Sequence, residues 1–173
     1  RCVAGEHALC TEFPTSLERK NPTNRAYDQA MVYRRIPGED WREYNRLSLW
    51  IYVDAPGFVS MHFCISLHNE GERLYPIPGR FEGTHCPCLT PGRWHHVVWE
   101  IPYAYRDRVV GVSFGPLMFG SPADCADTVR VYYDQLEIQA VEPEPYRGWE
   151  LGDRIAFCHA GYLPGSRKLA WIQ

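Results

Sequence analysis

The sequence predicts an all-β protein, and three observations support this. Apolar and polar residues alternate along several short segments, which is the period of strands with one buried face. The 173 residues include 14 glycines and 14 prolines, which supply frequent turns. Aromatic residues make up 14% of the chain, and aromatic side chains favour strands. We therefore expect many short antiparallel strands joined by turns.

The composition excludes several classes of partner. The formal net charge is −3 at pH 7, which argues against binding to nucleic acid or to an anionic membrane surface. No stretch approaches the roughly 20 apolar residues that span a bilayer, so we expect no membrane contact. The chain opens at Arg1 without a signal peptide, and we take it as a mature or excised segment.

The clearest strands are predicted at residues 47–53 and 59–67. The first carries aliphatic side chains on one face and the aromatic residues Trp50 and Tyr52 on the other. Its aliphatic residues are Leu47, Leu49, Ile51 and Val53. Residues 54–57, Asp-Ala-Pro-Gly, have the composition of a tight turn, which predicts that the two strands form a hairpin.

Further strands are expected at residues 29–36, 94–101, 109–114 and 128–138. Trp99 shares a strand face with Val97 and Ile101, and we assign it to the core. Residues 69–93 carry four prolines and four glycines without a clear period. An irregular stretch of this length is typical of a functional loop.

The composition changes after Gln139. Residues 140–152 combine proline and glutamate, as a stiff linker does, and residues 153–173 show a strand, a turn and a strand. Two strands do not make an independently stable domain, so this segment either docks on the main body or begins another domain. We therefore expect a body over 1–139, a linker over 140–152 and a partial domain with a short hairpin over 153–173.

Seven cysteines predict an oxidising compartment, and hence a secreted or cell-surface protein. Their odd number leaves at least one thiol unpaired. We expect this to be Cys64, because it lies inside an apolar strand, where a free cysteine behaves as a small hydrophobe. The candidate bridges are Cys2 with Cys10, and Cys125 with Cys86 or Cys88. Sequence alone leaves the pairing open.

Three segments of the body carry a family resemblance: residues 40–51, 91–101 and 129–138. They resemble the jelly-roll carbohydrate-binding modules of the galactose-binding-like group, which implies an antiparallel β-sandwich of jelly-roll type. In that group the last segment has the pattern aromatic-x-Asp-x-apolar, and its aspartate often joins a structural calcium site. The resemblance therefore places Asp134 at a candidate Ca²⁺ site.

The tail resembles a second family. Residues 155–172 look like the opening of the immunoglobulin-like domain that precedes the catalytic module in family nine glycoside hydrolases (cellulases). The matching residues are Gly161, Tyr162, Leu163, Pro164 and Lys168. Cys158 stands where that family has asparagine. The resemblance implies an appended catalytic domain that degrades polysaccharide.

Aromatic and arginine side chains are the candidate sugar ligands. Sugar rings stack on exposed aromatic faces, and arginine donates to hydroxyl or carboxylate oxygens. Trp50 and Tyr52 face away from the aliphatic side of their strand, and we expect His62 beside them on the neighbouring strand. The irregular stretch and the segment after strand 94–101 add Tyr75, Arg80 and Tyr105. The alternative is that the N-terminal segment or the tail covers Trp50 and Tyr52.

The sequence supports a metal site or a catalytic site less strongly than it supports sugar binding. His85-Cys-Pro-Cys88 has one residue between its cysteines, where zinc sites have two to four. For calcium, Asp124 and Asp127 offer oxygen ligands in addition to Asp134. A glycosidase needs two carboxylates at a fixed separation, and no strand carries such a pair. There is also no Gly-x-Ser-x-Gly motif of a hydrolase nucleophile.

We therefore expect a non-catalytic module of a secreted polysaccharide-degrading enzyme. It would bind a plant or algal polysaccharide through aromatic side chains and raise the local substrate concentration for the attached hydrolase. The main alternative is a structural spacer that packs on a catalytic module and binds no sugar. A third possibility is a self-contained lyase or hydrolase, which would need a carboxylate or Tyr/His/Arg cluster in a groove.

Overall fold

The computed structural model describes residues 1–15, 28–72, 83–101, 104–118, 122–142, 155–156 and 171–172. Every regular element in these residues is a β-strand, so the predicted all-β class is confirmed. None of the described segments forms a helix long and apolar enough to cross a membrane. The chain divides into two compact units, Arg1–Val141 and Glu142–Gln173.

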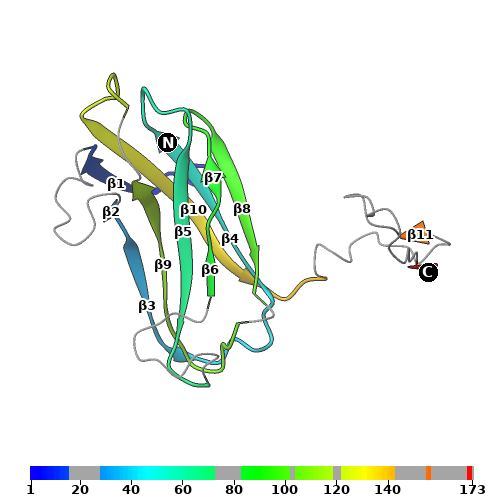
Figure 1. The fold of residues 1–173 in the computed structure, drawn as a ribbon. Coiled ribbons are helices and arrows are strands. Elements are labelled where there is room, and N and C mark those ends of the chain that lie inside the picture. Colours follow the sequence, from blue (N-terminus) through cyan, green and yellow to red (C-terminus); the bar gives the residue numbers. More distant parts are fainter. Residues whose placement is uncertain are drawn as a thin grey trace. The chain divides into compact units, whose positions relative to one another are not determined.

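The first unit is a sandwich of two antiparallel sheets, as predicted (Figure 1). The four-stranded sheet has the order β1 (Leu9–Pro14), β10 (Thr128–Gln139), β4 (Arg46–Asp54) and β8 (Trp94–Glu100). In the six-stranded sheet, β9 (Val109–Met118) pairs with β2 (Asp28–Gln29), β3 (Val32–Glu39) and β5 (Met61–Asn69). On its other side, β5 pairs with β6 (Gly83–His85) and β7 (Cys88–Leu89). In the second unit, β11 (Ile155–Ala156) pairs with β12 (Trp171–Ile172).

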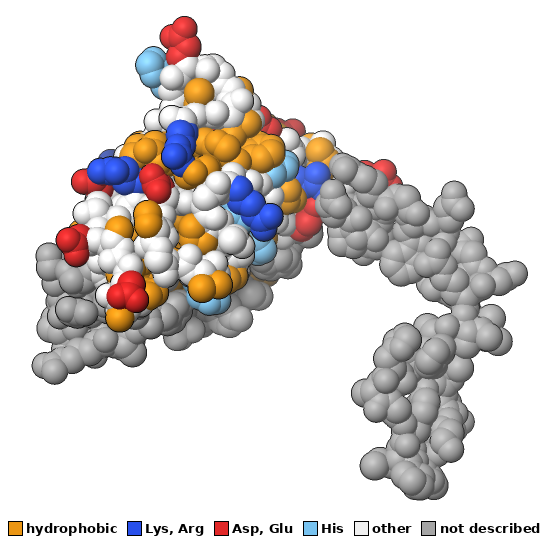
Figure 2. All heavy atoms as spheres, turned by 90° about the horizontal axis from the view of Figure 1, so that it is seen from above, with side chains coloured by type: hydrophobic (Ala, Val, Ile, Leu, Met, Phe, Trp, Pro, Cys, Tyr) orange, Lys and Arg blue, Asp and Glu red, His pale blue; other side chains and the backbone are white. Residues whose placement is uncertain are grey.

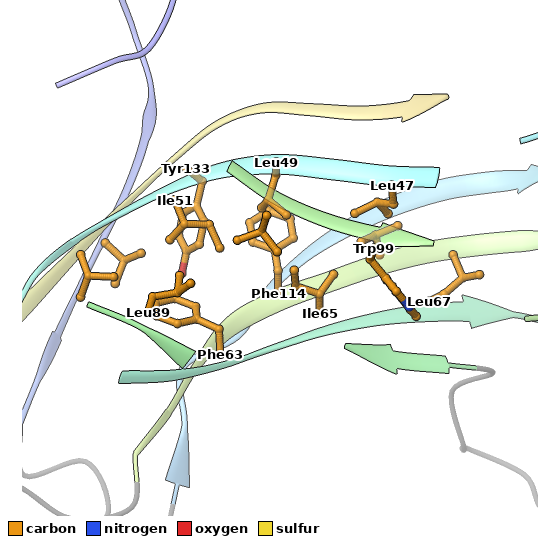
Figure 3. Packing of buried hydrophobic residues seen from close by; sticks show 14 of the residues in the cluster. Leu47, Leu49, Ile51, Phe63, Ile65, Leu67, Leu89, Trp99, Phe114 and Tyr133 are labelled. Atoms are coloured by element: carbon orange, nitrogen blue, oxygen red, sulfur yellow. The ribbon is translucent and has the colours of Figure 1, made fainter. Parts of the chain in front are cut away.

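The core lies between the two sheets, where the alternating side chains of β4 and β5 meet (Figure 3). The predicted aliphatic face of β4 is fully buried: Leu47, Leu49, Ile51 and Val53 are each 0–1% exposed. Phe63, Ile65 and Leu67 of β5 face it and are also fully buried. Trp99 lies in the same core, as predicted. Each such side chain contributes about 1.5–3 kcal/mol by leaving water, so this layer determines how the sheets are placed.

The predicted hairpin of residues 47–53 and 59–67 is wrong. β4 pairs with β10 and β8, and β5 pairs with strands of the other sheet, so residues 54–57 carry the chain from one sheet to the other. Both strands have an aliphatic face, and opposed sheets bury the two faces against each other. Gly57 allows the crossing: its φ is +87°, and a Cβ atom there would lie 2.6 Å from the Cα of Cys125.

Strands also form inside the stretch that the sequence predicts as irregular, because β6 and β7 lie within residues 69–93 and add two short strands beside β5. The predicted strand 29–36 is divided into β2 and β3, both paired with β9. β5 therefore has neighbouring strands along both of its edges.

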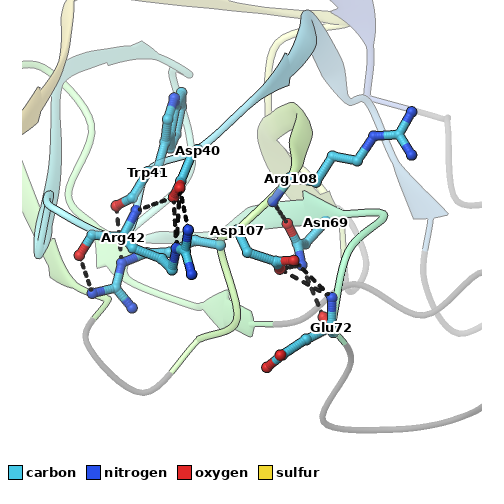
Figure 4. A network of polar contacts seen from close by, with 8 residues as sticks. Asp40, Trp41, Arg42, Asn69, Glu72, Asp107 and Arg108 are labelled. Carbon is cyan, nitrogen blue, oxygen red and sulfur yellow. Dashed lines mark hydrogen bonds and ion pairs between the residues drawn. The ribbon is translucent and has the colours of Figure 1, made fainter.

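A polar network joins the loops at one end of the six-stranded sheet (Figure 4). The Asn69 side chain donates to Asp107 Oδ1 and to the Glu72 carbonyl, both at 2.8 Å, and the Glu72 N–H also donates to Asp107. These donors, the Asn69 amide first, lower the pKa of Asp107. The Arg108 N–H donates to Asn69 Oδ1, and the Glu70 N–H donates to the Arg108 carbonyl. The backbone is thereby fixed where Glu70 and Arg108 project.

Candidate binding site on the outer face of the six-stranded sheet

The predicted sugar ligands do not form one site. Trp50 and Tyr52 lie on the outer face of the four-stranded sheet and are half-buried. His62 is exposed on the outer face of the other sheet, so the expectation that it lies beside them is wrong, because β4 and β5 belong to different sheets. Tyr105 is exposed in the loop before β9. Tyr75 and Arg80 lie outside the described residues.

Trp50 and Tyr52 belong to a group of rings that we call the aromatic platform: Trp50, Tyr52, Trp94, His96 and Tyr132. The Trp50 ring is stacked on the His96 ring, with 4.7 Å between centroids and 17° between planes. Tyr52 makes edge contacts with Trp94 and Tyr132. The rings therefore use part of their surface on one another.

The N-terminal segment also contacts the platform. The guanidinium of Arg1 lies 4.3 Å from the centroid of the Tyr52 ring. The N–H groups of Val3 and Ala4 donate to Asp134 Oδ2 at 2.7 and 3.2 Å. These bonds, with the one from Val3 first, lower the pKa of Asp134. The alternative that the N-terminal segment covers this face therefore applies to Tyr52.

Asp134 is thus a hydrogen-bond acceptor for backbone amides in this structure. The three aspartates expected to bind calcium do not come together: Asp127 precedes β10, whereas Asp134 is seven positions further along, about 24 Å in an extended strand. No group of three His, Cys, Asp or Glu side chains among the described residues is placed to hold a metal ion. A calcium ion at Asp134 stays a prediction.

The outer face of the six-stranded sheet holds a differently arranged aromatic residue, Tyr33. Its ring crosses β9 at Gly111, where a Cβ atom would lie 2.2 Å from the Tyr33 hydroxyl oxygen. The hydroxyl donates to the Val110 carbonyl at 3.2 Å. The His68 ring makes an edge contact with the Tyr33 ring, with 5.1 Å between the ring centroids. Tyr33 is nevertheless 52% exposed, more than any other Phe, Tyr or Trp in the described part of the chain. It is fixed in place and open to solvent.

Small and polar side chains form the surface beside Tyr33. Ser113 is buried on β9, and its hydroxyl is 2.8 Å from His68 Nε2. Ser66 of β5 lies 3.3 Å from the Thr84 hydroxyl of β6. Burial lowers the pKa of His68, which favours the neutral form of its ring. Ser66 and Ser113 are themselves buried, so His68 and Thr84 are the more accessible polar groups beside Tyr33.

A polar cavity of about 490 Å³ adjoins Tyr33 at the end of this face. Its lining residues are Tyr33, Arg35, Ile36, Pro37, Gly38, Glu70, Arg108 and Val110. Arg108 is 4.0 Å from Glu70, and both side chains are more than half exposed. We call Tyr33, Arg35, His68, Glu70 and Arg108 the Tyr33 site. It combines an open aromatic ring with two arginines and one carboxylate.

A second cavity, of about 510 Å³, lies at the open edge of the sandwich between β1 and β3. Core residues such as Leu49 and Phe114 reach its wall, and Leu9 and Leu136 are exposed there. Because this wall is mainly apolar, it offers few partners to a ligand covered with hydroxyl groups. The Tyr33 site fits such a ligand better.

None of the residues of the Tyr33 site was predicted from the sequence. A signal was present, because Tyr33 and Arg35 are two positions apart in a predicted strand and therefore share a face. Nothing in the local sequence, however, shows that Gly111 lies beneath the Tyr33 ring. Seen from above, hydrophobic side chains lie at several places on the first unit, with charged side chains among them (Figure 2). Surface hydrophobicity alone therefore does not single out one site.

No family model matches the chain, and no curated protein matches it. Solved structures match the chain at low sequence identity. One, described as "CBM4 structure and function", has 16% sequence identity and a TM-score of 0.42, and the match covers 76% of this chain and 82% of the other. Another is the family 11 carbohydrate-binding module of the cellulosomal cellulase Lic26A-Cel5E of Clostridium thermocellum, at 12% identity and a TM-score of 0.37, covering 78% and 83%.

Proposed function

We propose that the first unit is a non-catalytic carbohydrate-binding module and that the Tyr33 site binds the sugar. The observation that carries this proposal is the Tyr33 ring, which is held against β9 and remains 52% exposed beside a polar cavity. A pyranose ring presents C–H groups on one face, and these complement an aromatic π surface. Because the ring is already fixed, stacking costs little conformational entropy.

The arginines supply the polar half of recognition. Arg35 and Arg108 line the same cavity, and their guanidinium groups can donate in pairs to sugar hydroxyls or to a uronate carboxylate. The proposed ligand is a plant or algal polysaccharide, of which a few residues contact the site. Micromolar to millimolar affinity corresponds to about 4–8 kcal/mol, which suits a few contacts of this kind.

The wider role is also a proposal. The resemblance of the tail to a cellulase-type immunoglobulin-like domain supports an attached glycoside hydrolase, and the cysteine content supports secretion. Binding would then raise the local concentration of substrate for that hydrolase. Among the described residues that line the cavity, Glu70 is the one acidic residue, and a glycosidase needs two carboxylates. This argues against a glycosidase. The Tyr/His/Arg cluster that a lyase would need is present at the site, and release of unsaturated sugar products from the same polymers would overturn the non-catalytic role.

Retardation in native gels tests the proposal, with xylan, mixed-linkage β-glucan, carboxymethyl-cellulose, mannan, pectin and alginate as ligands, each with and without EDTA. The matched variants are Tyr33→Ala and Trp50→Ala, with circular dichroism to show that both fold. We expect one or two polymers to retard the chain, Tyr33→Ala to weaken binding at least tenfold, and Trp50→Ala to bind like the unmodified chain. The reverse pattern would move the site to the aromatic platform.

The second candidate function is a structural spacer, and the aromatic platform is the observation that favours it. Half-buried rings on an outer face suit a contact with a neighbouring domain. If none of the polymers retards the folded chain, sugar binding is refuted for those glycans and the spacer becomes the better account.

A further inference from the structure

Two cysteines face each other across neighbouring strands of the six-stranded sheet. β5 pairs with β6 at Ile65–His85 and with β7 at His62–Cys88. Between these pairs, the Phe63 N–H donates to the Pro87 carbonyl at 2.9 Å. The register is therefore unbroken, and it places Cys64 directly opposite Cys86.

Whether the Cys64–Cys86 pair is hydrogen-bonded through its backbone determines whether a disulfide can join it. Antiparallel strands alternate between hydrogen-bonded pairs and closer pairs without backbone hydrogen bonds, whose Cα atoms are about 4.5 Å apart. Since Phe63 is hydrogen-bonded to Pro87, the next pair, Cys64 with Cys86, is of the closer type. Disulfides need Cα atoms about 4.4–6.8 Å apart, so the strand geometry is compatible with a bond.

The surroundings of the two thiols agree with the register. Cys64 is buried, whereas Cys86 is exposed and so accessible to an oxidant in solution. Cys64 Sγ lies 3.3 Å from the Ser66 hydroxyl, on the outer face of the sheet. Burial, and after it the neighbouring Cys64, raises the pKa of the Cys86 thiol. The two sulfur atoms are thus near neighbours on one face.

We propose that Cys64 and Cys86 form a cross-strand disulfide when the protein meets a low-molecular-weight disulfide such as oxidised glutathione. This replaces the expectation that Cys64 is the unpaired cysteine. Cys88 is the useful comparison, because it is two residues from Cys86 but faces His62 and has no cysteine opposite. The inference is independent of the proposed sugar binding.

The step balances as thiol–disulfide exchange. The Cys86 thiolate attacks one sulfur of oxidised glutathione and releases one glutathione thiolate. The Cys64 thiol then loses its proton and attacks the Cys86 sulfur of the mixed disulfide, which releases the second glutathione. The two cysteines lose two electrons and two protons, and one glutathione disulfide becomes two thiols.

The bond would link residues 22 positions apart and fasten the strands on either side of the intervening segment. A loop of this size loses enough entropy in the unfolded chain for the oxidised protein to melt roughly 5–10 °C higher than the reduced one. Because attack needs the Cys86 thiolate, exchange should also be faster at alkaline pH.

The experiment uses the full 173-residue chain, reduced and then incubated with oxidised glutathione, followed by peptide mapping without reductant. We expect a Cys64–Cys86 peptide, a higher Tm that dithiothreitol reverses, and loss of both in Cys86→Ser. The control Cys88→Ser should keep both. A map that shows Cys86 joined to Cys88 or Cys125, or both thiols still free after prolonged oxidation, would overturn the proposal. If Cys86→Ser folds poorly, Cys64→Ala gives the same comparison.

Discussion

The two outer faces of the sandwich hold their aromatic side chains in different ways. On the four-stranded sheet the rings of the aromatic platform contact one another, and Arg1 lies over Tyr52. On the six-stranded sheet Tyr33 lies across a glycine and is half exposed. The number of aromatic residues on a face is therefore a poor guide to sugar binding. A fixed ring with a free surface is the better criterion, because stacking needs that surface.

The four-stranded face also contains a structural ion pair. Arg46 donates from Nε and Nη2 to Glu100 Oε1 at 2.8 and 2.5 Å, and their side chains are only 7% and 22% exposed. This pair lies on neighbouring strands, β4 and β8. The buried pair stabilises the fold, whereas the charged groups of the Tyr33 site are exposed and can contact a ligand.

The largest expected effect follows from breaking this pair. Glu100→Ala removes the carboxylate partner of a buried guanidinium, which should cost about 3 kcal/mol or more and lower the Tm by roughly 6–12 °C. Thermal unfolding followed by circular dichroism measures this. The control is Glu12→Ala, which breaks the exposed pair with Arg130 and should leave the Tm nearly unchanged. Similar losses in both variants would contradict a structural role for this face.

The core-facing side of β4 in the four-stranded sheet could be predicted from the sequence. The alternation in residues 47–53 shows which side chains are buried, and the structure confirms it for all four aliphatic residues. Alternation cannot identify the strand with which a segment pairs, because the pattern shows only that one face of the segment is buried. A turn composition at residues 54–57 is equally compatible with a hairpin and with a crossing between sheets. The predicted position of His62 beside Trp50 and Tyr52 was wrong because it assumed that the two strands form a hairpin.

The next effect concerns the Tyr33 site. Gly111→Ala places a methyl group where the Tyr33 ring now lies, and the ring, as the movable partner, should swing away from β9. We expect about a tenfold loss of affinity for the retarding glycan, or about 1.4 kcal/mol, measured by titration calorimetry. The matched test is the same change in a Tyr33→Ala background, where it should have no further effect on affinity. An additive loss would show that Gly111 acts without Tyr33.

This site could not be predicted from the sequence, and the reason is its long-range geometry. Tyr33 and Gly111 are 78 positions apart, and only the pairing of β3 with β9 brings them together. Arg35 and Arg108 reach one cavity through the same pairing. Local patterns can suggest which residues share a face of a strand. They cannot show which residues of other strands lie beneath or beside those side chains.

The smallest expected effect tests whether the N-terminal segment limits access to the aromatic platform. Asp134→Ala removes the acceptor for the Val3 and Ala4 amides, so hydrogen exchange at both should become faster while the Tm falls by no more than about 2 °C. In the unmodified chain the pKa of Asp134 is lowered, so its contribution is present above the ordinary aspartate pKa of about 3.9 and is lost as the pH falls through the lowered value.

Glycan affinity of the same variant decides between the two faces. If the Tyr33 site binds the sugar, Asp134→Ala should bind as the unmodified chain does, because Arg1 of the released segment lies over Tyr52, on the four-stranded sheet. If affinity rises, the released segment had been competing with the glycan, and the platform is the binding surface. Unchanged exchange at Val3 and Ala4 would instead show that Asp134 does not hold the segment in solution.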